Sequence, residues 1–235
     1  MISVMGIKER QERDREAVSR AILDAARELF VTEGYGNVSI RKIAERVEYS
    51  PAALYGYFPS KDDIFYALAE EGFRLLYTRD DAVALDADLD ALEPIERIRT
   101  IFWRLYEFSR QHPQYFELMF MDRSVPRITQ VYERFAFARE MKIHLVAQIQ
   151  ACIDAKVFPA HVDANVAFRL LTMGLMGAAM MRLCDRLGHG ENADALARDV
   201  LNVTLRGLQS GVALESTFVE VDCLPDDTPA SKKVS

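Results

Sequence analysis

Residues 39–61, SIRKIAERVEYSPAALYGYFPSK, constrain the fold more than any other stretch, because they read as two short helices with a tight turn between them. Ser39 and Ser50 each stand where a hydroxyl N-cap would begin a helix, and Pro51 suits a first turn because its missing N–H costs nothing there. A single apolar stripe follows from the spacing of Ile40, Ile43, Ala44 and Val47. The pattern predicts a helix-turn-helix.

The second of these helices presents small and aromatic side chains beside a basic one. Pro51, Ala52 and Ala53 at its start would let the backbone approach the floor of a DNA major groove. Phenol hydroxyls and a Lys side chain farther along could bind phosphates and fix the register on the duplex. DNA reading is therefore the first hypothesis for this chain.

Several separated motifs agree in order and spacing with one known family. They are Ile22-Leu23-Asp24-Ala25-Ala26 with Leu29-Phe30 and Gly34-Tyr35, Ser39-Ile40-Arg41-Lys42-Ile43-Ala44, and Leu54-Tyr55-Gly56-Tyr57-Phe58 with Ser60-Lys61-Asp62. Within residues 15–66 the chain thus resembles the tetracycline-repressor (TetR) family of transcriptional regulators. The resemblance implies an all-α homodimer that binds a palindromic operator in double-stranded DNA and responds to a small molecule.

The resemblance also implies roles for individual residues. The predicted DNA-binding set is Arg41, Lys42, Ser50, Pro51, Ala52, Ala53, Tyr55, Gly56, Tyr57 and Lys61. Within it, Arg41 would reach a base edge, the proline and alanines would lie at the groove floor, and the two tyrosines and Lys61 would hold phosphates. The chain departs from the family at Gly56, where a larger contacting group is common, and at Glu48, where the turn commonly carries Gly. Because Glu tolerates positive φ poorly, the conformation of this turn stays open.

The net charge of −7 belongs to the C-terminal part of the chain. Residues 1–61 hold ten Lys or Arg and nine Asp or Glu, a net of +1, which leaves −8 for residues 62–235. A near-neutral head on an acidic body is compatible with DNA binding of modest non-specific affinity and steep salt dependence. The chain starts unlike a signal peptide and has no unbroken run of about eighteen apolar residues, so we expect a cytoplasmic protein with no membrane partner.

Helical periodicity runs through the remainder of the chain, and we find no internal repeat. We expect about nine helices, three in an N-terminal head and six in a C-terminal body. The predicted organisation is a flexible arm over 1–14, a helix-turn-helix domain over 15–61, an effector-binding and dimerisation domain over 62–214, and a disordered tail over 215–235. The helix that begins at Asp62 would join head to body, and Gly72 in its middle implies either a close packing contact or a bend.

Residues 164–187 are apolar almost all round, so a helix there must be covered on several sides. Small residues would allow close helix approach, and methionines would pack adaptably. Composition alone leaves an intrachain core and a subunit interface equally open, and the resemblance favours an interface made by the last two helices. The predicted dimer residues are Met173, Gly177, Met180, Met181, Val200, Val203 and Leu208.

The body also holds more aromatic residues than a plain helical core needs. One interpretation is a cavity for a small hydrophobic effector, oriented by a few polar groups, and the other is a solid core. The predicted effector pocket consists of Phe102, Trp103, Tyr106, Phe116, Met119, Phe120, Phe135, Met141, His144 and Gln148.

Other classes of protein have little support in the sequence. Cys152, Cys184 and Cys223 have no close spacing, which predicts neither a disulfide framework nor a zinc site. The chain lacks the motifs of serine hydrolases, phosphate-binding loops and zinc proteases, so we expect no catalytic residues, metal or cofactor. We therefore predict a repressor that a small effector releases from DNA. The alternative is a helix-turn-helix adaptor regulated by a protein partner through its acidic body.

Overall fold

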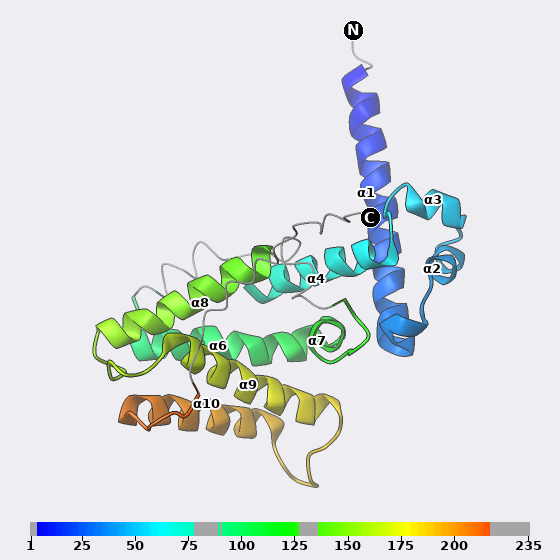
Figure 1. The fold of residues 1–235 in the computed structure, drawn as a ribbon. Coiled ribbons are helices and arrows are strands. Elements are labelled where there is room, and N and C mark those ends of the chain that lie inside the picture. Colours follow the sequence, from blue (N-terminus) through cyan, green and yellow to red (C-terminus); the bar gives the residue numbers. More distant parts are fainter. Residues whose placement is uncertain (1–3, 78–88, 90, 127–135, 217–235) are drawn as a thin grey trace, which may run out of the picture.

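The computed structural model describes residues 4–77, 89, 91–126 and 136–216, and this part of the chain contains nine α-helices and one short 3-10 helix (Figure 1). In chain order they are α1 (Val4–Glu33), η1 (Tyr35–Asn37), α2 (Ile40–Arg46), α3 (Pro51–Tyr55), α4 (Lys61–Tyr77), α6 (Pro94–Gln111), α7 (Pro113–Phe120), α8 (Ala136–Asp154), α9 (Ala164–Leu183) and α10 (Ala193–Ser210). The predicted all-α class is confirmed.

Short polar side chains begin these helices where the sequence predicted. The Ser39 hydroxyl accepts the amide N–H of Lys42 at 3.2 Å, and the Ser50 hydroxyl accepts that of Ala53 at 3.1 Å, with Pro51 in the first turn. Each cap satisfies an amide that the helix itself leaves without a partner. At the other end of the chain, Gly211 ends α10 with a φ of 70°, a left-handed conformation that glycine adopts without strain.

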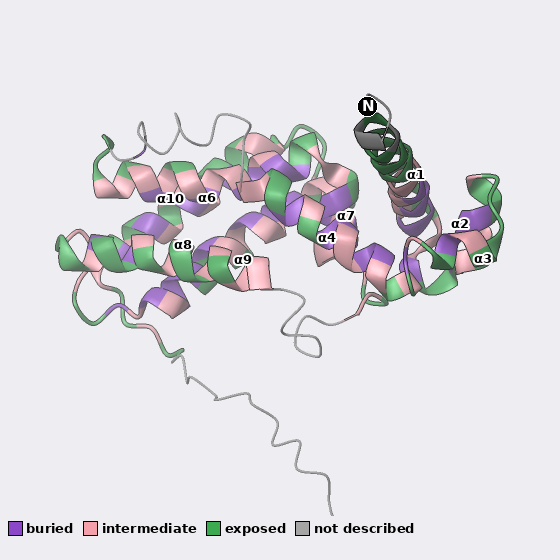
Figure 2. Cartoon of the chain, turned by 90° about the horizontal axis from the view of Figure 1, so that it is seen from above, coloured by how far each residue is buried: buried purple, intermediate pink, exposed green. Residues whose placement is uncertain are grey.

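Helices α1, α2 and α3 form the head around a small apolar core. Ile22 and Phe30 of α1, Ile43 of α2 and Leu54 of α3 are 0 to 1% exposed and belong to one cluster of buried residues. Figure 2 shows these helices at one end of the molecule, with buried positions turned inward and exposed positions outward. The predicted apolar stripes are therefore the surfaces that hold the head together.

The body extends from α4 through α6 to α10, and α9 lies at its centre. Helix α9 packs against α6, α8 and α10, and it buries eight of its residues. It is the one helix in the described ranges that could cross a membrane by length and mean hydropathy, although 39% of that window is already buried inside the subunit. The sequence expectation of no membrane partner was based on the lack of an unbroken apolar run. Two arginines interrupt the apolar residues of α9, but they lower the mean hydropathy of the helix only a little.

The structure differs from the sequence expectation at the N-terminus. Instead of a flexible arm over 1–14, α1 is a single 30-residue helix from Val4. Residues 8–17 lack a covered face, but Glu, Gln, Lys and Arg have high helix propensity and can extend a helix that the buried part of α1 has nucleated.

The sequence also predicted a helix within the apolar stretch 164–187 and a disordered tail over 215–235. Helix α9 stops at Leu183, four residues before the end of the apolar stretch 164–187, and Asp185 follows with a φ of 50°. Of the predicted tail over 215–235, residues 217–235 lie outside the described residues.

Gly72 marks a close contact between α4 and α7. A Cβ built at this position would overlap the Met119 sulfur and lie 3.2 Å from Cδ1 of Tyr115. Of the two interpretations of this glycine, close packing is therefore confirmed. The contact matters because α4 is the only helix that leads along the chain from the head into the body.

Glu48 adopts the conformation that its side chain disfavours. Its φ is 59°, in the left-handed region, and the amide of the following Tyr49 donates to Ala44 O at 2.9 Å. The turn between α2 and α3 therefore keeps a geometry suited to glycine, although this chain places Glu there. A non-glycine residue in this region costs about 1 kcal/mol or more.

We expect Gly72→Ala to lower the free energy of unfolding by about 1 kcal/mol, because the methyl group forces Met119 and Tyr115 away. Gly207→Ala in α10 is the matched control, because a Cβ at this position would meet only the Val212 side chain, at 4.0 Å. It should stabilise the protein by up to about 1 kcal/mol through helix propensity. Urea unfolding of both variants provides the comparison, and equal gains at the two sites would contradict close packing at Gly72.

We expect Glu48→Gly to stabilise the protein by about 0.5–1 kcal/mol, because glycine removes the left-handed strain at some cost in unfolded-state entropy. Thermal unfolding should shift upward by roughly 2–4 °C per kcal/mol in a chain of this size. Glu48→Ala removes the same charge without relieving the strain, so it should give no gain. A gain in both variants would assign the effect to charge instead.

Candidate nucleic-acid interface

The α2–turn–α3 unit carries most of the predicted DNA-binding set on its outer side. The exposed members are Arg41, Ser50, Pro51, Ala52, Tyr55 and Gly56, and the partly exposed members are Lys42, Ala53, Tyr57 and Lys61. Leu54 and Phe58 turn inward, at 0 and 9% exposure. Three apolar or aromatic groups, Pro51, Ala52 and Tyr55, thus face solvent on a five-residue helix that is anchored on its other side by the buried Leu54.

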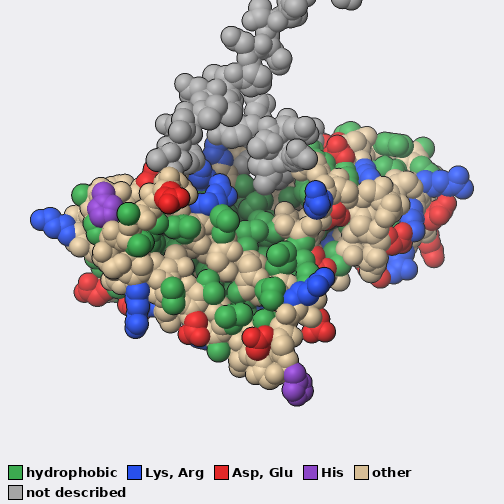
Figure 3. Space-filling view, turned by 60° about the horizontal axis from the view of Figure 1, so that its bottom comes forward, with side chains coloured by type: hydrophobic (Ala, Val, Ile, Leu, Met, Phe, Trp, Pro, Cys, Tyr) green, Lys and Arg blue, Asp and Glu red, His purple; other side chains and the backbone are tan. Residues whose placement is uncertain are grey.

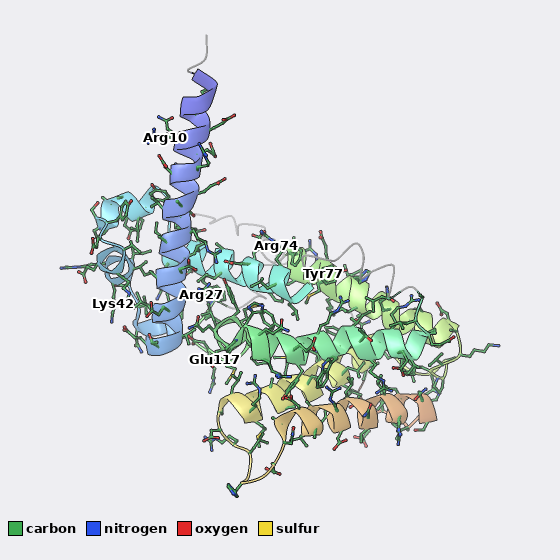
Figure 4. The ribbon with its side chains drawn as sticks, turned by 180° about the vertical axis from the view of Figure 1, so that it is seen from behind. Arg10, Arg27, Lys42, Arg74, Tyr77 and Glu117 are labelled. Carbon is green, nitrogen blue, oxygen red and sulfur yellow. The ribbon has the colours of Figure 1, made fainter. Side chains whose placement is uncertain are left out.

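The two basic residues of α2 in the predicted DNA-binding set, Arg41 and Lys42, are held by weak ion pairs. The Nε of Arg41 lies 2.9 Å from a carboxylate oxygen of Glu45, and the Arg41 side chain is 81% exposed. Lys42, labelled in Figure 4, pairs with Glu33 of α1. Exposed pairs of this kind contribute little to stability. Phosphates or base edges could therefore replace the two carboxylates at small cost.

Lys61 is held more firmly than the other basic residues of the set. Its Nζ donates to the Tyr35 carbonyl at 2.8 Å and lies 4.0 Å from the centre of the Tyr35 ring. Tyr35 in turn donates its hydroxyl to Asp62, and burial together with this carboxylate raises the pKa of the phenol. Lys61 thus sits at the start of α4 in a defined position, with N–H groups left to bind a phosphate.

Sequence reasoning missed one residue of this surface. Arg15 of α1 donates to the Gly56 carbonyl at 3.1 Å, and its guanidinium lies 5.3 Å from the centre of the Tyr57 ring. It therefore braces the end of α3 against α1. The available signal was its spacing, because Arg15 precedes the buried Ile22 by seven residues and shares its helix face. The expected flexible arm concealed that relation.

The predicted effector pocket lies among α6, α7 and α8, with several members packed against one another. Phe102, Tyr106 and Phe116 are buried, and the Phe116 and Phe120 rings are 5.1 Å apart. The Tyr106 hydroxyl donates to Asp194 of α10 at 2.9 Å. Trp103 lies under the guanidinium of Arg198, 4.4 Å from its ring centre. These contacts are compatible with a core as well as with a pocket wall.

Other members of the predicted pocket are less enclosed. Met119 contacts the Gly72 position, Met141 and Gln148 are partly exposed, and His144 is exposed with its ring 5.7 Å from that of Tyr77. Phe135 lies outside the described residues. The ligand role of these residues stays a prediction.

A small hollow opens between α4 and α6, beside the predicted pocket. Its volume is about 30 Å³, room for one or two water molecules, and its wall includes Tyr77, Arg104, Glu107, Phe108 and His112. None of the nine predicted pocket residues that the structure describes lines it. Among the residues that the structure describes, no cluster of three or more His, Cys, Asp or Glu side chains could hold a metal ion.

The predicted dimer residues of α9 are exposed on the subunit surface. Met173, Met180 and Met181 are 60, 48 and 38% exposed, and a Cβ at Gly177 would meet only open space. Val203 of α10 is 71% exposed. Leu208 differs, because it is 2% exposed and lies well round α10 from Val203, so it belongs to the intrachain core.

Comparison with known proteins identifies the helix-turn-helix region and most of the body. Residues 22–68 match the family described as "Bacterial regulatory proteins, tetR family". The nucleoid occlusion factor SlmA of Vibrio campbellii is 32% identical over 170 residues, which cover 69% of this chain and 78% of that protein. SlmA of Yersinia pseudotuberculosis is 30% identical over 175 residues, covering 71 and 82% of the two chains.

Solved structures share the fold over a similar extent. The TetR family regulator PfmR from Thermus thermophilus has a TM-score of 0.61 at 23% identity and covers 82% of this chain and 99% of its own. FadR from Bacillus subtilis, solved in complex with stearoyl-CoA, has a TM-score of 0.64 at 15% identity, with coverage of 80 and 98%. With the helix-turn-helix geometry and the identity to full-length relatives, these findings show that the chain belongs to the TetR family of DNA-binding transcriptional regulators.

Proposed function

We propose that this protein is a homodimeric repressor that binds a palindromic operator and is released by a small hydrophobic effector. Residues 15–61 would form the DNA-binding domain and 62–214 the effector-binding and dimerisation domain. Both would act in the cytoplasm, where the DNA is. The observation that carries the proposal is the exposure of Pro51, Ala52 and Tyr55 on a helix whose other face is buried.

Exposure of this kind suits a major groove better than it suits water. The N-terminal end of α3 carries only small side chains, so its backbone can come close to base edges. Arg41 would contact a base, and Tyr55, Tyr57 and Lys61 would contact phosphates on either side. Lys42 lies in the first turn of α2 and Ser50 caps α3, and both would contact the phosphate backbone of the same groove.

The apolar face of α9 and α10 supports the proposed dimerisation. Figure 3 shows hydrophobic side chains spread over the face of the molecule that these two helices form at the bottom of Figure 1. Met173, Met180 and Val203 lie on it at 48 to 71% exposure. Exposed apolar patches of this kind are typical of protein–protein interfaces, which supports the proposal. Two copies joined here would present two heads to a symmetric DNA sequence.

The effector is proposed to bind among the aromatic residues of α6, α7 and α8. Such surroundings favour a mostly apolar ligand, with His144 and Gln148 as orienting polar groups. A ligand releases DNA only if it prefers the state in which the heads are mis-spaced. Helix α4 would carry that change, because it contacts α6, α7 and α8 in the body and α1 in the head.

A second function has one specific observation in its favour. The relatives that cover most of this chain are named nucleoid occlusion factors, a name that does not describe a ligand-released repressor. An adaptor that binds DNA and is regulated by a protein partner would use the acidic remainder of the chain, since residues 62–235 carry a net charge of −8 by difference between the whole chain and residues 1–61.

One pair of experiments separates these functions. A mobility shift with the DNA upstream of this protein's own gene tests for an operator. Mass spectrometry of small molecules that co-purify with the full-length protein tests for an effector. A bound apolar compound whose removal strengthens DNA binding supports the repressor, whereas specific DNA binding that no extract of small molecules alters supports the adaptor.

We expect Arg41→Ala to weaken operator binding by about 1–3 kcal/mol and to relax the preference at one base pair in each half-site. Lys61→Ala should weaken binding to all sequences and make the salt dependence shallower by about 1 in slope for each phosphate that is no longer neutralised. Titrations on specific and random duplexes at several salt concentrations measure both effects. Identical behaviour of the two variants on both duplexes would contradict the assigned roles.

We expect Val203→Asp to convert the dimer to monomers at micromolar concentration, because a symmetric interface would bury two uncompensated carboxylates. Ile143→Asp is the matched control, since Ile143 is 62% exposed on α8, away from the proposed interface. Analytical ultracentrifugation measures the mass of each variant. A dimer that survives Val203→Asp would place the interface elsewhere.

A further inference from the structure

The turn that follows α7 in the body holds the backbone of the head. The Tyr35 amide donates to Oδ2 of Asp122 at 2.8 Å, and the next amide, that of Gly36, donates to Oγ of Ser124 at 2.9 Å. Two consecutive N–H groups of η1 are thus bonded to two side chains that lie 87 and 88 residues farther along the chain. We refer to Asp122 and Ser124 with these two amides as the η1 staple.

The staple is built as a closed hydrogen-bond network. Oδ1 of Asp122 accepts the amide of Ser124 at 2.8 Å and its hydroxyl at 2.6 Å, which leaves the hydroxyl oxygen free to accept from Gly36. Burial alone would raise the pKa of Asp122, but the bonds from Ser124 and the Tyr35 amide, with the charge of Lys61, hold it below its ordinary value. The carboxylate is therefore ionised near neutral pH, and its hydrogen bonds are of the stronger, charge-assisted kind.

Tyr35 connects this network to the DNA-binding surface. Its amide is bonded to Asp122, and its carbonyl and ring hold Lys61, the proposed phosphate contact at the start of α4. Tyr35 therefore connects the Asp122 carboxylate of the body to the Lys61 ammonium group of the DNA-binding surface. A shift of the turn after α7 would move the Tyr35 backbone and Lys61 with it.

A second set of contacts ties α7 to α1. Arg27 of α1, labelled in Figure 4, donates to the Tyr115 hydroxyl at 2.7 Å and lies 4.9 Å from the centre of that ring. Helix α7 also packs against α4 at Gly72. The head is thus held to the body by α4 and, independently, by α7 and its exit turn.

From these contacts we infer that Asp122 and Ser124 are positioning residues for DNA reading, which hold each head at the angle that the spacing of two half-sites requires. The inference rests on the proposed function as a symmetric DNA reader. It goes beyond that function because neither residue touches DNA and because it assigns the head's orientation to the turn after α7 as well as to α4. The two heads of a dimer would each have one staple.

The test uses a duplex that the full-length wild-type protein selects from a randomised DNA pool. It is remade with its half-sites moved by one and two base pairs, and with one half-site scrambled. For Asp122→Ala and Ser124→Ala we expect about tenfold weaker binding at the best spacing and a flatter dependence on spacing. Binding to the single half-site should change less than twofold, because the contacts of each head with DNA are intact.

One control variant and two further test variants complete the design. Asp154→Asn changes the same charge as Asp122→Asn at an exposed position of α8 and should leave the spacing profile unchanged. Asp122→Asn keeps one acceptor oxygen and should fall between wild type and Asp122→Ala. Gly36→Ala tests the staple from the head, since its Cβ would lie 3.3 Å from that of Ser124 and should flatten the profile in the same way.

Amide hydrogen exchange without DNA supplies a second readout. In Asp122→Ala the Tyr35 and Gly36 amides should exchange at least tenfold faster, while amides within α2 and α3 keep their protection. An unchanged spacing profile, or equal losses on paired and single half-sites, would overturn the positioning role. If the wild-type protein selects no symmetric duplex, the proposed function fails, and unaltered exchange at these two amides would then reject the staple itself.

Discussion

Burial of Tyr35 is the constraint on which the arrangement of head and body depends. Tyr35 is 5% exposed, and its ring centre lies 5.0 Å from that of Phe30 and 5.7 Å from that of Phe65. Its polar groups must therefore find hydrogen-bond partners inside the protein. The amide finds Asp122, the carbonyl finds Lys61, and the hydroxyl finds Asp62. Because these partners come from α4 and from the turn after α7, satisfying one tyrosine brings together the head, the linker helix and the body.

The electrostatics of the head follow a different principle. Several of its basic residues are paired with acids on the same small domain, such as Arg41 with Glu45 and Arg46 with Glu28. The pairs are exposed, so they cost little to exchange for phosphates, and they keep the free head near electrical neutrality. Affinity for DNA then depends on specific contacts more than on a large positive field, which agrees with the acidic charge of the rest of the chain.

The face of the body that α9 and α10 form keeps large apolar side chains exposed. Helix α9 buries residues against α6, α8 and α10, yet its Met173, Met180 and Met181, with Val203 of α10, remain on the surface. Where the two helices face each other they come close, since a Cβ at Gly174 would lie only 2.7 Å from the Val200 side chain. The pair therefore forms a firm surface with an apolar outer side, a suitable base for holding two heads at a constant separation.

The sequence by itself determined the helices, their caps and the apolar stripes, because these depend on spacing along the chain. Ser39 and Ser50 act where local chemistry predicted, and the motifs of residues 22–62 identified the head. It could not determine the conformation of Glu48, since that residue's own preference opposes the φ of 59° that the surrounding turn imposes. Nor could it separate core from interface among the residues of α10, where only packing distinguishes Leu208 from Val203. Tertiary structure alone decided that Asp122 bonds to Tyr35, 87 residues away, and that Arg15 bonds to Gly56, 41 residues away. Such contacts depend on how the helices pack, and the local periodicity of the sequence does not specify that packing.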